Sequence, residues 1–242
     1  MNQPWALIIP MANEEKDFDL FIIPLKEELA KLPQGKVFLI VDNVSVDKTL
    51  QLCKLLSSAD PRFETVWAPE NKNVVDAYLR GYKEAMKTNA KFIIEMDAGF
   101  SHDPAELPKF LNLLHQGYSC VYGSRLMEGG SMNDSTPYRK FLSKTGTILA
   151  NLLLGTKLQD MTSGYQGFHR DIVSKFLNYK LKSVAHFYQT EIRYLLRKYK
   201  SIEIPINYKA PSPRVSKNAI KNSIKSLLYY FMRRLTLRPI SI

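Results

Sequence analysis

The sequence predicts an α/β protein in which a mostly parallel sheet is flanked by helices and followed by a C-terminal amphipathic helix. Two observations support this fold class. Short apolar runs alternate along the chain with segments of helical periodicity, and several of these runs end in a polar residue. Right-handed crossovers bring the carboxyl ends of parallel strands to one edge of the sheet, where ligands bind. We therefore expect the polar residues after the strands to converge on one site.

Five apolar runs in the first half have the length and composition of strands. They are residues 5–10, 36–42, 63–70, 91–97 and 118–124. Pro10 is expected to end the first strand, and Asp42 and Asp97 stand at the carboxyl ends of the second and fourth. Carboxylates at strand ends are difficult to explain by packing, so they are the first candidates for ligand contact.

Four segments between these strands have helical periodicity, and their first residues include good caps. They are residues 18–32, 48–56, 73–87 and 103–117. Pro24 is expected to interrupt the first helix. Asp47 can cap the second helix, and Asp103 can cap the fourth, where Pro104 fits the first turn.

The pattern changes after residue 130. We expect a helix over residues 138–155, a polar glycine-bearing loop over 160–170 and a second helix over 183–199. A strand over 201–209, a Pro/Ser loop over 210–217 and a final helix over 215–235 should follow. The predicted organisation is a main domain over residues 1–210, followed by a basic loop and an amphipathic helix over residues 211–242.

The chain has 242 residues, of which 45% are hydrophobic and 24% charged, so it is long enough to bury a core. Cys53 and Cys120 are its two cysteines, which suggests a reducing compartment and no disulfide framework. No apolar run approaches the roughly 20 residues that span a bilayer, and the N-terminus lacks a signal-peptide pattern.

The net charge of +11 is unevenly placed, because Glu203 is the last acidic residue. A basic C-terminal segment suits nucleic acid, an anionic lipid surface or a phosphorylated ligand, or is simply solvated. Apolar residues recur at helical spacing on one face of the final helix, at positions 220, 224, 227, 228, 231 and 235. This helix could lie in a membrane interface, pack on the domain or join an oligomer.

Seven segments together resemble family 2 glycosyltransferases of the Rossmann-like GT-A fold, and most closely the dolichol-phosphate or polyprenol-phosphate sugar (mannose) synthases. They occur in the family's order over residues 5–217: IIPMANEE, FLIVDNVSVDKT, FIIEMDAGFSHDP, VYGSR, DMTSGYQGFHR, FYQTEI, and IEIPINY with a later SK. The resemblance implies inverting transfer of a sugar from a nucleotide-sugar, of GDP-mannose or UDP-hexose type, to a polyprenyl phosphate. It also implies peripheral location at the cytoplasmic face of the membrane. A nucleic-acid partner is not expected, because the acids at the strand ends would repel a phosphate backbone.

The resemblance assigns roles to particular residues. Catalytic roles fall to Asp97, Arg125, Asp160 and Glu191. Nucleotide-sugar binding falls to Pro10, Ala12, Glu14, Val41, Asp42, Asn43, Asp97, Ala98 and Gly99. Phosphate binding falls to Arg125, Arg214 and Lys217, and Asp97 would hold a divalent cation, Mg²⁺ or Mn²⁺, on the diphosphate.

Physical chemistry agrees with these roles. Negative charge grows on a nucleoside diphosphate as it leaves, so a metal ion or fixed cations must meet it. A phosphate acceptor is already ionised near neutral pH and needs alignment and neutralisation rather than a general base. Arginine suits bidentate phosphate contact, while lysine acts as a point charge.

Several of these residues have alternative interpretations. Glu14 could be an exposed carboxylate at a helix start, and Asp42 could cap a turn. Arg125 could pair with a carboxylate, and Asp160 or Glu191 could orient basic side chains. His102 is interpreted as a turn residue that hydrogen-bonds locally.

The sequence departs from the family pattern at four places. The usual aromatic is Ala12, the usual Asp-Asp is Asp42-Asn43, the usual Asp-Ala-Asp is Asp97-Ala98-Gly99, and an expected Arg is Pro211. Three metal arrangements therefore remain open: Asp97 alone, Asp97 with Glu95 from the same strand face, or metal-free transfer by Arg125 and Lys217.

Two other functions remain open at this point. A family 2 enzyme with a saccharide hydroxyl acceptor would need a base such as Asp160 or Glu191. A degenerate protein that binds nucleotide-sugar without turnover would follow from loss of the second Asp. A homo-oligomer is a further possibility that the sequence leaves open.

Overall fold

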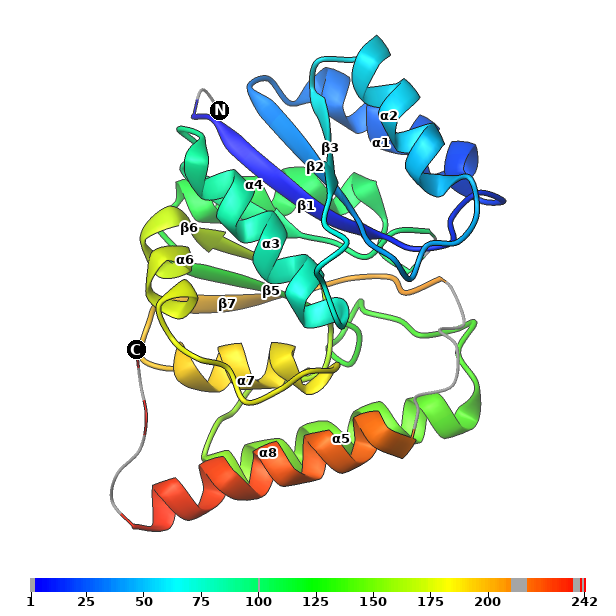
Figure 1. Cartoon of the computed structure of the whole chain (residues 1–242). Helices are drawn as coiled ribbons and strands as arrows, with labels where there is room; N and C mark the ends of the chain where they lie inside the picture. The colour runs from blue at the N-terminus through cyan, green and yellow to red at the C-terminus, as the bar shows by residue number, and fades with distance from the viewer. Residues whose placement is uncertain (1–2, 100, 210–216, 237–239, 241) are drawn as a thin grey trace.

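The computed structural model describes residues 3–99, 101–209, 217–236, 240 and 242. Within these residues the strands form one sheet in the order β3-β2-β1-β4-β6-β5-β7 (Figure 1). The strands are β1 Trp5–Met11, β2 Gly35–Val41, β3 Phe63–Trp67, β4 Phe92–Glu95, β5 Cys120–Ser124, β6 Gln166–His169 and β7 Ser201–Pro205. The predicted α/β class is confirmed.

Every pairing in the sheet is parallel except those of β6, which runs antiparallel to both β4 and β5. Glu95 pairs with Gln166, and Tyr122 pairs with the same Gln166 from the other side. Because β6 is reversed, the loop that leads into it arrives at the edge where β4 and β5 end. That edge therefore receives polar residues from both halves of the chain.

Helices cover both faces of the sheet, since side chains alternate along each strand. Leu7 and Ile9 of β1 pack with α1, α2 and α4, whereas Ala6 and Ile8 pack with α3, α6 and α7. The helices are α1 Phe18–Lys31, α2 Thr49–Ala59, α3 Val74–Lys87, α4 Leu107–His115, α5 Pro137–Leu154, α6 Arg170–Leu177, α7 Phe187–Leu195 and α8 Lys217–Leu235, with a 3₁₀ turn η1 Pro104–Glu106 before α4.

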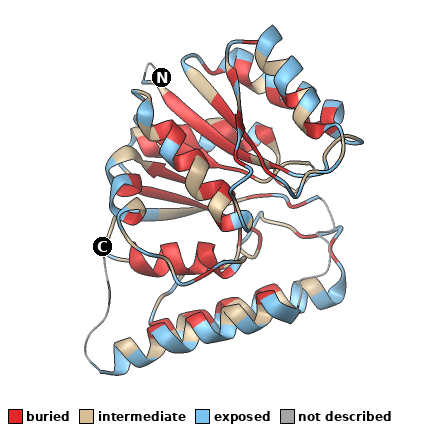
Figure 2. Ribbon diagram, in the orientation of Figure 1, coloured by how far each residue is buried: buried red, intermediate tan, exposed pale blue. Residues whose placement is uncertain are grey.

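A smaller cluster joins α5, α7 and α8. Ala150, Leu154, Tyr194 and Tyr230 are among its buried members. Helices α5 and α8 lie side by side beneath α7, with long exposed sides (Figures 1 and 2). In the described part of the chain, no helix has the combined length and apolarity to span a bilayer.

The most informative difference from prediction is β6. We expected a loop over residues 160–170, but Gln166–His169 is a strand between β4 and β5. A β-carbon on Gly167 would lie 3.2–3.3 Å from Ile94, Leu114 and Phe110, so glycine permits the tight packing of α4 over this strand. Its neighbour Gln166 is polar but has partners on both sides. Tertiary packing therefore overrides weak strand propensity here.

Three helices also differ from expectation. Pro24 lies inside α1 without ending it, because it is on the exposed side and the helix is anchored by buried Phe21, Leu25 and Leu29. The carbonyl that Pro24 leaves without a donor belongs to Leu20, which is 60% exposed, so water can satisfy it. Helix α7 begins at Phe187, later than predicted, and α6 was not foreseen.

Candidate active site

Asp97 follows β4 at the carboxyl edge of the sheet and has its environment fixed by two aromatic residues. The Tyr78 hydroxyl of α3 donates to Asp97 Oδ1. The Asp97 backbone N–H donates to His102 Nδ1 at 2.9 Å, which confirms the local hydrogen bond expected of His102. The Asp97 side chain is nevertheless 41% exposed. One carboxylate oxygen is thus held while the residue remains accessible.

His102 is a neutral support for this aspartate rather than a charged partner. It is buried and stacks on Tyr165. Burial lowers its pKa to about 4, despite the opposing effect of the Asp97 charge. Its Nδ1 therefore accepts a hydrogen bond at neutral pH.

Glu14 reaches the same edge from the loop after β1. Asn13 has a positive φ of 60° and is fixed by the loop after β2: its side chain donates to Val44 O at 2.9 Å and accepts from Val46 N at 3.0 Å. The Glu14 N–H donates to Thr49 Oγ1 at 2.8 Å. Among the described residues, none forms a hydrogen bond or ion pair with its carboxylate. Burial, followed by the charges of neighbouring acids, raises the pKa of Glu14 to about 6.

The other residues predicted to contact the nucleotide-sugar surround this point. Asp42 is buried and accepts from Val44 N at 3.0 Å, while Asn43 Nδ2 donates to Pro69 O at 2.8 Å. The two residues thus also shape the loop, as the turn interpretation expected. Pro10 and Ala98 are half-buried, Val41 is buried and Ala12 is exposed. Their contact with a nucleotide-sugar stays a prediction.

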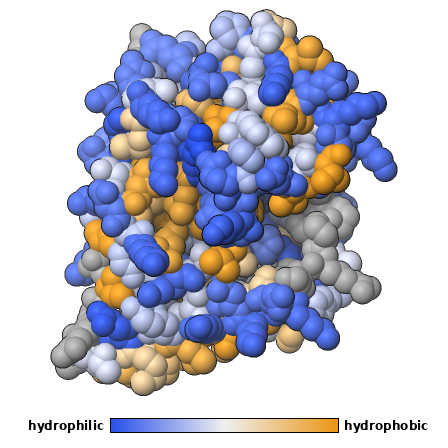
Figure 3. Space-filling model, in the orientation of Figure 1, coloured by the Kyte–Doolittle hydropathy of each residue, from blue (hydrophilic) through white to orange (hydrophobic). Residues whose placement is uncertain are grey.

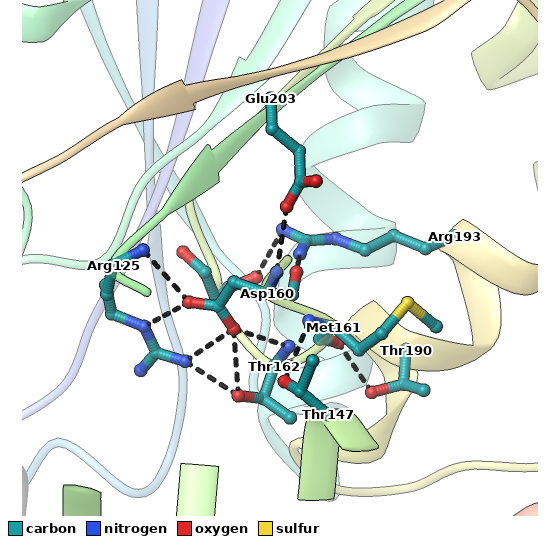
Figure 4. Close-up of polar contacts among 9 residues, drawn as sticks. Arg125, Thr147, Asp160, Met161, Thr162, Thr190, Arg193 and Glu203 are labelled. Carbon is teal, nitrogen blue, oxygen red and sulfur yellow. Dashed lines mark hydrogen bonds and ion pairs between the residues drawn. The ribbon is translucent and has the colours of Figure 1, made fainter. Parts of the chain in front are cut away.

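Arg125 and Asp160 form a buried pair after β5 and before β6 (Figure 4). Arg125 Nε and Nη2 donate to the two Asp160 oxygens at 2.7 and 3.0 Å, and Nη2 also donates to Thr162 Oγ1 at 2.7 Å. Burial would raise the pKa of Asp160, but the charge and hydrogen bonds of Arg125 outweigh it and hold that pKa well below its ordinary value. The carboxylate-pairing alternative for Arg125 is what the structure shows, and its phosphate contact stays a prediction.

Two residues that the sequence did not single out support this pair. The Glu203 carboxylate accepts from the backbone N–H groups of Gln159 and Asp160 at 2.7 and 2.8 Å. Arg193 is buried and donates to the carbonyls of Asp160 and Ser163 (Figure 4). Burial lowers the pKa of Arg193. Its position in the middle of a helical apolar pattern was the available signal, since such an arginine needs buried acceptors.

Glu191 is bound within the protein rather than exposed at the edge of the sheet. It is fully buried and accepts from the backbone N–H groups of Lys182 and Ser183 at 2.6 and 2.8 Å, and from the Tyr230 hydroxyl. It therefore joins α7 to α8. The catalytic role predicted for Glu191 is not supported by this geometry, because an acid with three donors and no exposure has no route to a substrate.

Glu95 lies in the interior of the protein and does not line the candidate site. It is fully buried and accepts from Tyr82, Tyr188 and Gln166. Burial raises its pKa to about 8, against the effect of the tyrosine hydrogen bonds. This carboxyl is enclosed and favours its neutral form, so its geometry gives no support to the metal arrangement that used Glu95.

Lys217 and Arg214 are the other two residues predicted to bind phosphate. Lys217 begins α8 and is exposed. Arg214 lies outside the described residues.

A cavity of about 270 Å³ lies between α5, α7 and α8. Its walls are largely apolar, and they include Leu142, Leu149, Ile220, Ile224 and Leu227. Arg139 is its one arginine, and the buried Arg139 Nε has no hydrogen-bond partner within the described ranges. Thr162, which accepts from Arg125, also lines it. A guanidinium with a buried, unpartnered N–H in a largely apolar cavity suits an anionic amphiphile.

A divalent cation fits the Asp97 side of this edge. Among the described residues there is no group of three or more His, Cys, Asp or Glu side chains that would bind a metal alone. Magnesium commonly uses one or two carboxylates and takes its other oxygens from phosphates and water. Asp97, accessible and with one oxygen held by Tyr78, meets that requirement.

Comparison with known proteins adds independent information. The family model of glycosyl transferase family 2 matches residues 6–177. Polyprenol monophosphomannose synthase of Mycolicibacterium smegmatis is 29% identical over 223 residues, covering 91% of this chain and 83% of that protein. Undecaprenyl-phosphate mannosyltransferase of Micrococcus luteus is 27% identical over 203 residues, covering 83% and 82%. Dolichol-phosphate mannosyltransferase of Pyrococcus furiosus is 27% identical over 206 residues, covering 84% and 56%.

Solved structures agree on the fold. Glucosyl-3-phosphoglycerate synthase from Mycobacterium tuberculosis, in complex with uridine diphosphate, has a TM-score of 0.66 at 14% identity over 94% of this chain and 80% of that one. The same enzyme with Mn²⁺, UDP-glucose and phosphoglyceric acid has a TM-score of 0.64 at 14% identity, covering 93% and 80%.

Proposed function

This chain belongs to glycosyl transferase family 2, and on this premise we propose that it transfers a sugar from a nucleotide-sugar to a polyprenyl phosphate at a membrane surface. The proposed sugar is mannose, since the three relatives of 27–29% identity described above are named for mannose transfer or phosphomannose synthesis. The donor half of the reaction is assigned to the edge formed by Glu14, Asp42 and Asp97.

The observation that carries the acceptor assignment is the cavity between α5, α7 and α8. It is apolar, as a polyprenyl chain requires, and it contains the unpartnered Nε of Arg139. Thr162 connects its wall to Arg125 and hence to the rim of the sheet. A lipid phosphate held by Arg139 would thus face the rim, while its chain lies between the helices.

The acids near the site also favour a phosphate acceptor. A sugar hydroxyl needs a general base, and the two candidates were Asp160 and Glu191. Asp160 is paired with Arg125, and Glu191 accepts three hydrogen bonds. An ionised phosphate needs no base, so this arrangement agrees with attack by phosphate oxygen on the anomeric carbon.

The chain's own residues then position the two reactants. Asp97 would hold a divalent cation on the diphosphate; when bound, that cation stabilises the charge that grows on the leaving group. Tyr78 and His102 fix the orientation of Asp97. Arg139 neutralises the attacking phosphate and reduces its repulsion from the diphosphate.

We propose that α5 and α8 together form the membrane contact. Apolar side chains of both helices are exposed: Tyr138, Phe141, Ile148, Leu149 and Leu152 on α5, and Ile224, Leu228, Met232 and Leu235 on α8. Hydrophobic atoms line the lower margin of the molecule in Figure 3, over these two helices. Basic residues such as Lys144 and Lys225 accompany them, which suits an anionic lipid surface. The cytoplasmic face is the proposed location.

The test is a transfer assay with radiolabelled GDP-mannose, UDP-glucose and related donors, with undecaprenyl phosphate in anionic vesicles. We expect labelled lipid from one donor and no transfer to free saccharides. Arg139→Gln should raise the KM for the lipid about tenfold, equivalent to about 1.4 kcal/mol. Lys140→Gln, a change of the exposed neighbour, should leave it within about twofold. Transfer to a saccharide without lipid would overturn the proposal.

A further inference from the structure

We infer that Glu14 supplies the second carboxylate of the divalent-cation site, in place of the side chain that Gly99 lacks. The inference rests on the proposed use of a nucleotide-sugar. It assigns a metal contact to a residue of the β1 loop, whereas the sequence pattern placed this residue with the nucleoside.

The first observation concerns the space beside Gly99. A β-carbon on Gly99 would lie 3.5 Å from Glu14 Oε2, and apart from chain neighbours no other described atom comes within 4 Å of it. The Glu14 carboxylate thus reaches the point where a side chain at position 99 would begin. Position 99 is two residues after Asp97, so Glu14 brings a carboxylate to the place where the usual motif has its second aspartate.

The second observation is that hydrogen bonds hold the backbone around Glu14 in place. Asn13 takes a left-handed conformation, which costs energy for a residue with a β-carbon unless neighbours fix it. Its side chain is bonded to Val44 and Val46, and the next N–H is bonded to Thr49. The backbone is therefore held on both sides of Glu14, yet within the described residues its carboxylate has no hydrogen-bond or ion-pair partner. A fixed, unpaired and half-buried carboxylate is costly unless it binds something.

A third observation indicates a ligand at Asp97 independently of Glu14. Gln189 of α7 is 5% exposed, and its Oε1 has no hydrogen-bond partner among the described residues. The point where a Gly164 β-carbon would sit lies 3.3 Å from Asp97 Oδ2 and 3.4 Å from Gln189 Nε2. The small residue at 164 thus leaves the Gln189 amide group, whose Oε1 is unsatisfied, close to Asp97 Oδ2 and to the His102 ring. Carboxylate and amide oxygens are the donors that hard divalent cations select.

The experiment measures Mn²⁺ binding to the full chain by electron paramagnetic resonance, with GDP or UDP present. Glu14→Gln keeps the shape of the side chain and removes its charge, and we expect at least a tenfold weaker Kd for Mn²⁺. Asp19→Asn is the matched control, because it removes an exposed acidic charge in the first turn of α1, five residues from Glu14 in the sequence. It should change the Kd by less than twofold.

Nucleotide binding in EDTA separates a metal contact from a nucleoside contact. Glu14→Gln should bind the nucleoside diphosphate as the wild type does when metal is absent. An unchanged Mn²⁺ affinity, or an equal loss of nucleotide binding in EDTA, would overturn the inference. Adding Gly99→Asp to Glu14→Gln should restore Mn²⁺ binding, since aspartate tolerates the left-handed φ of 71° better than most residues. If the double variant did not regain Mn²⁺ binding, this would count against the inference that Glu14 takes the place of an aspartate at position 99.

The same experiments distinguish this inference from the proposed function. Undiminished sugar transfer in EDTA would overturn the metal role of Glu14 and leave the transferase in place. Mn²⁺ binding that depends on Glu14, in a chain that transfers no sugar to polyprenyl phosphate, would do the reverse.

Discussion

The two halves of the sheet edge use their charged residues in opposite ways. On the β1–β2–β4 side, the Glu14 carboxylate has no hydrogen-bond or ion-pair partner among the described residues, and Asp97 keeps 41% of its side chain exposed. On the β5–β6–α7 side, Asp160 and Glu191 are completely buried and each has several donors. Glu14 and Asp97 follow strands β1 and β4, Asp160 lies in the loop before β6, and Glu191 lies within α7. The comparison teaches that a strand-end acid indicates a ligand only when its hydrogen-bonding capacity is not already used by the fold.

The largest loss of stability is expected from Asp160→Asn, on the β5–β6–α7 side, where the acids already have partners. Removing one member of a buried ion pair leaves Arg125 with an uncompensated charge, which costs about 3–5 kcal/mol of unfolding free energy. Urea unfolding monitored by circular dichroism measures it. Replacing both residues, as Arg125→Met with Asp160→Leu, should cost less than the single change. A single variant as stable as the wild type would contradict our description of this half.

On the β1–β2–β4 side, Asp97→Asn should slow sugar transfer and leave the unfolding free energy almost unchanged. Loss of the carboxylate proposed to hold a divalent cation on the diphosphate should reduce kcat about 10²–10³-fold, in the range seen when one transition-state contact is removed. The unfolding free energy should change by less than about 0.5 kcal/mol, since asparagine keeps an oxygen that can accept from Tyr78 and the side chain at position 97 is partly exposed. A transfer assay and urea unfolding on the same preparation test both statements. Strong destabilisation would place Asp97 with the structural acids instead.

The pH dependence of the unfolding free energy tests whether Glu95 belongs with the buried acids that the fold has already paired. Its pKa is about 8 in the folded protein and 4.5 ordinarily, mainly because of burial. Between these values the unfolded state has lost the proton while the folded state retains it. The stability due to the neutral Glu95 is therefore complete below pH 4.5 and is lost as the pH rises through about 8.

Urea unfolding of the metal-free protein between pH 5 and 8 should show this decline, which amounts to a few kcal/mol at most. Glu95→Gln should flatten the curve, whatever its own baseline stability, because glutamine does not titrate. Equal slopes for the two proteins would mean that Glu95 is ionised in the fold.

The smallest effect concerns the bond between α7 and α8. Tyr230→Phe removes the hydroxyl that donates to the buried Glu191 carboxylate, and hydrogen bonds to charged groups contribute about 1.5–3 kcal/mol. Glu191 keeps its two backbone donors, so we expect the lower part of that range in urea unfolding. The adjacent Tyr229→Phe is the control. It should cost under about 0.5 kcal/mol, because the hydroxyl of this exposed residue is not bonded to Glu191.

The sequence was sufficient for most of the fold because period-two and period-3.6 apolar patterns determine which faces are buried. Strand β6 was missed because Gln166 and Gly167 lack strand propensity, and their environment comes from Glu95 and Phe110, which are distant in sequence. The pairing of Arg125 with Asp160 was foreseen only as an alternative. Residue type shows that a group is charged, whereas its availability depends on partners 35 residues away.

The candidate site was predicted unevenly for the same reason. Asp97 and the local hydrogen bond of His102 could be predicted from one segment, but Tyr78, which donates to the Asp97 carboxylate, comes from a helix with no motif. Arg139 lies on a predicted helix with basic residues, and nothing local distinguishes it from Lys140. Only the packing of α5 against α8 encloses one and exposes the other.

The reversed direction of β6 has a consequence for how such an enzyme can change over evolution. The chain leaves the sheet after Ser124 and returns at Gln166, which pairs with Tyr122 of the strand it left. The intervening residues, with α5 and the loop before β6, are therefore an excursion with adjacent ends. Excursions of this kind can lengthen, shorten or be replaced at small cost in loop-closure entropy. The part proposed to bind the acceptor can thus diversify as a module, while the half of the sheet proposed to bind the donor keeps its register.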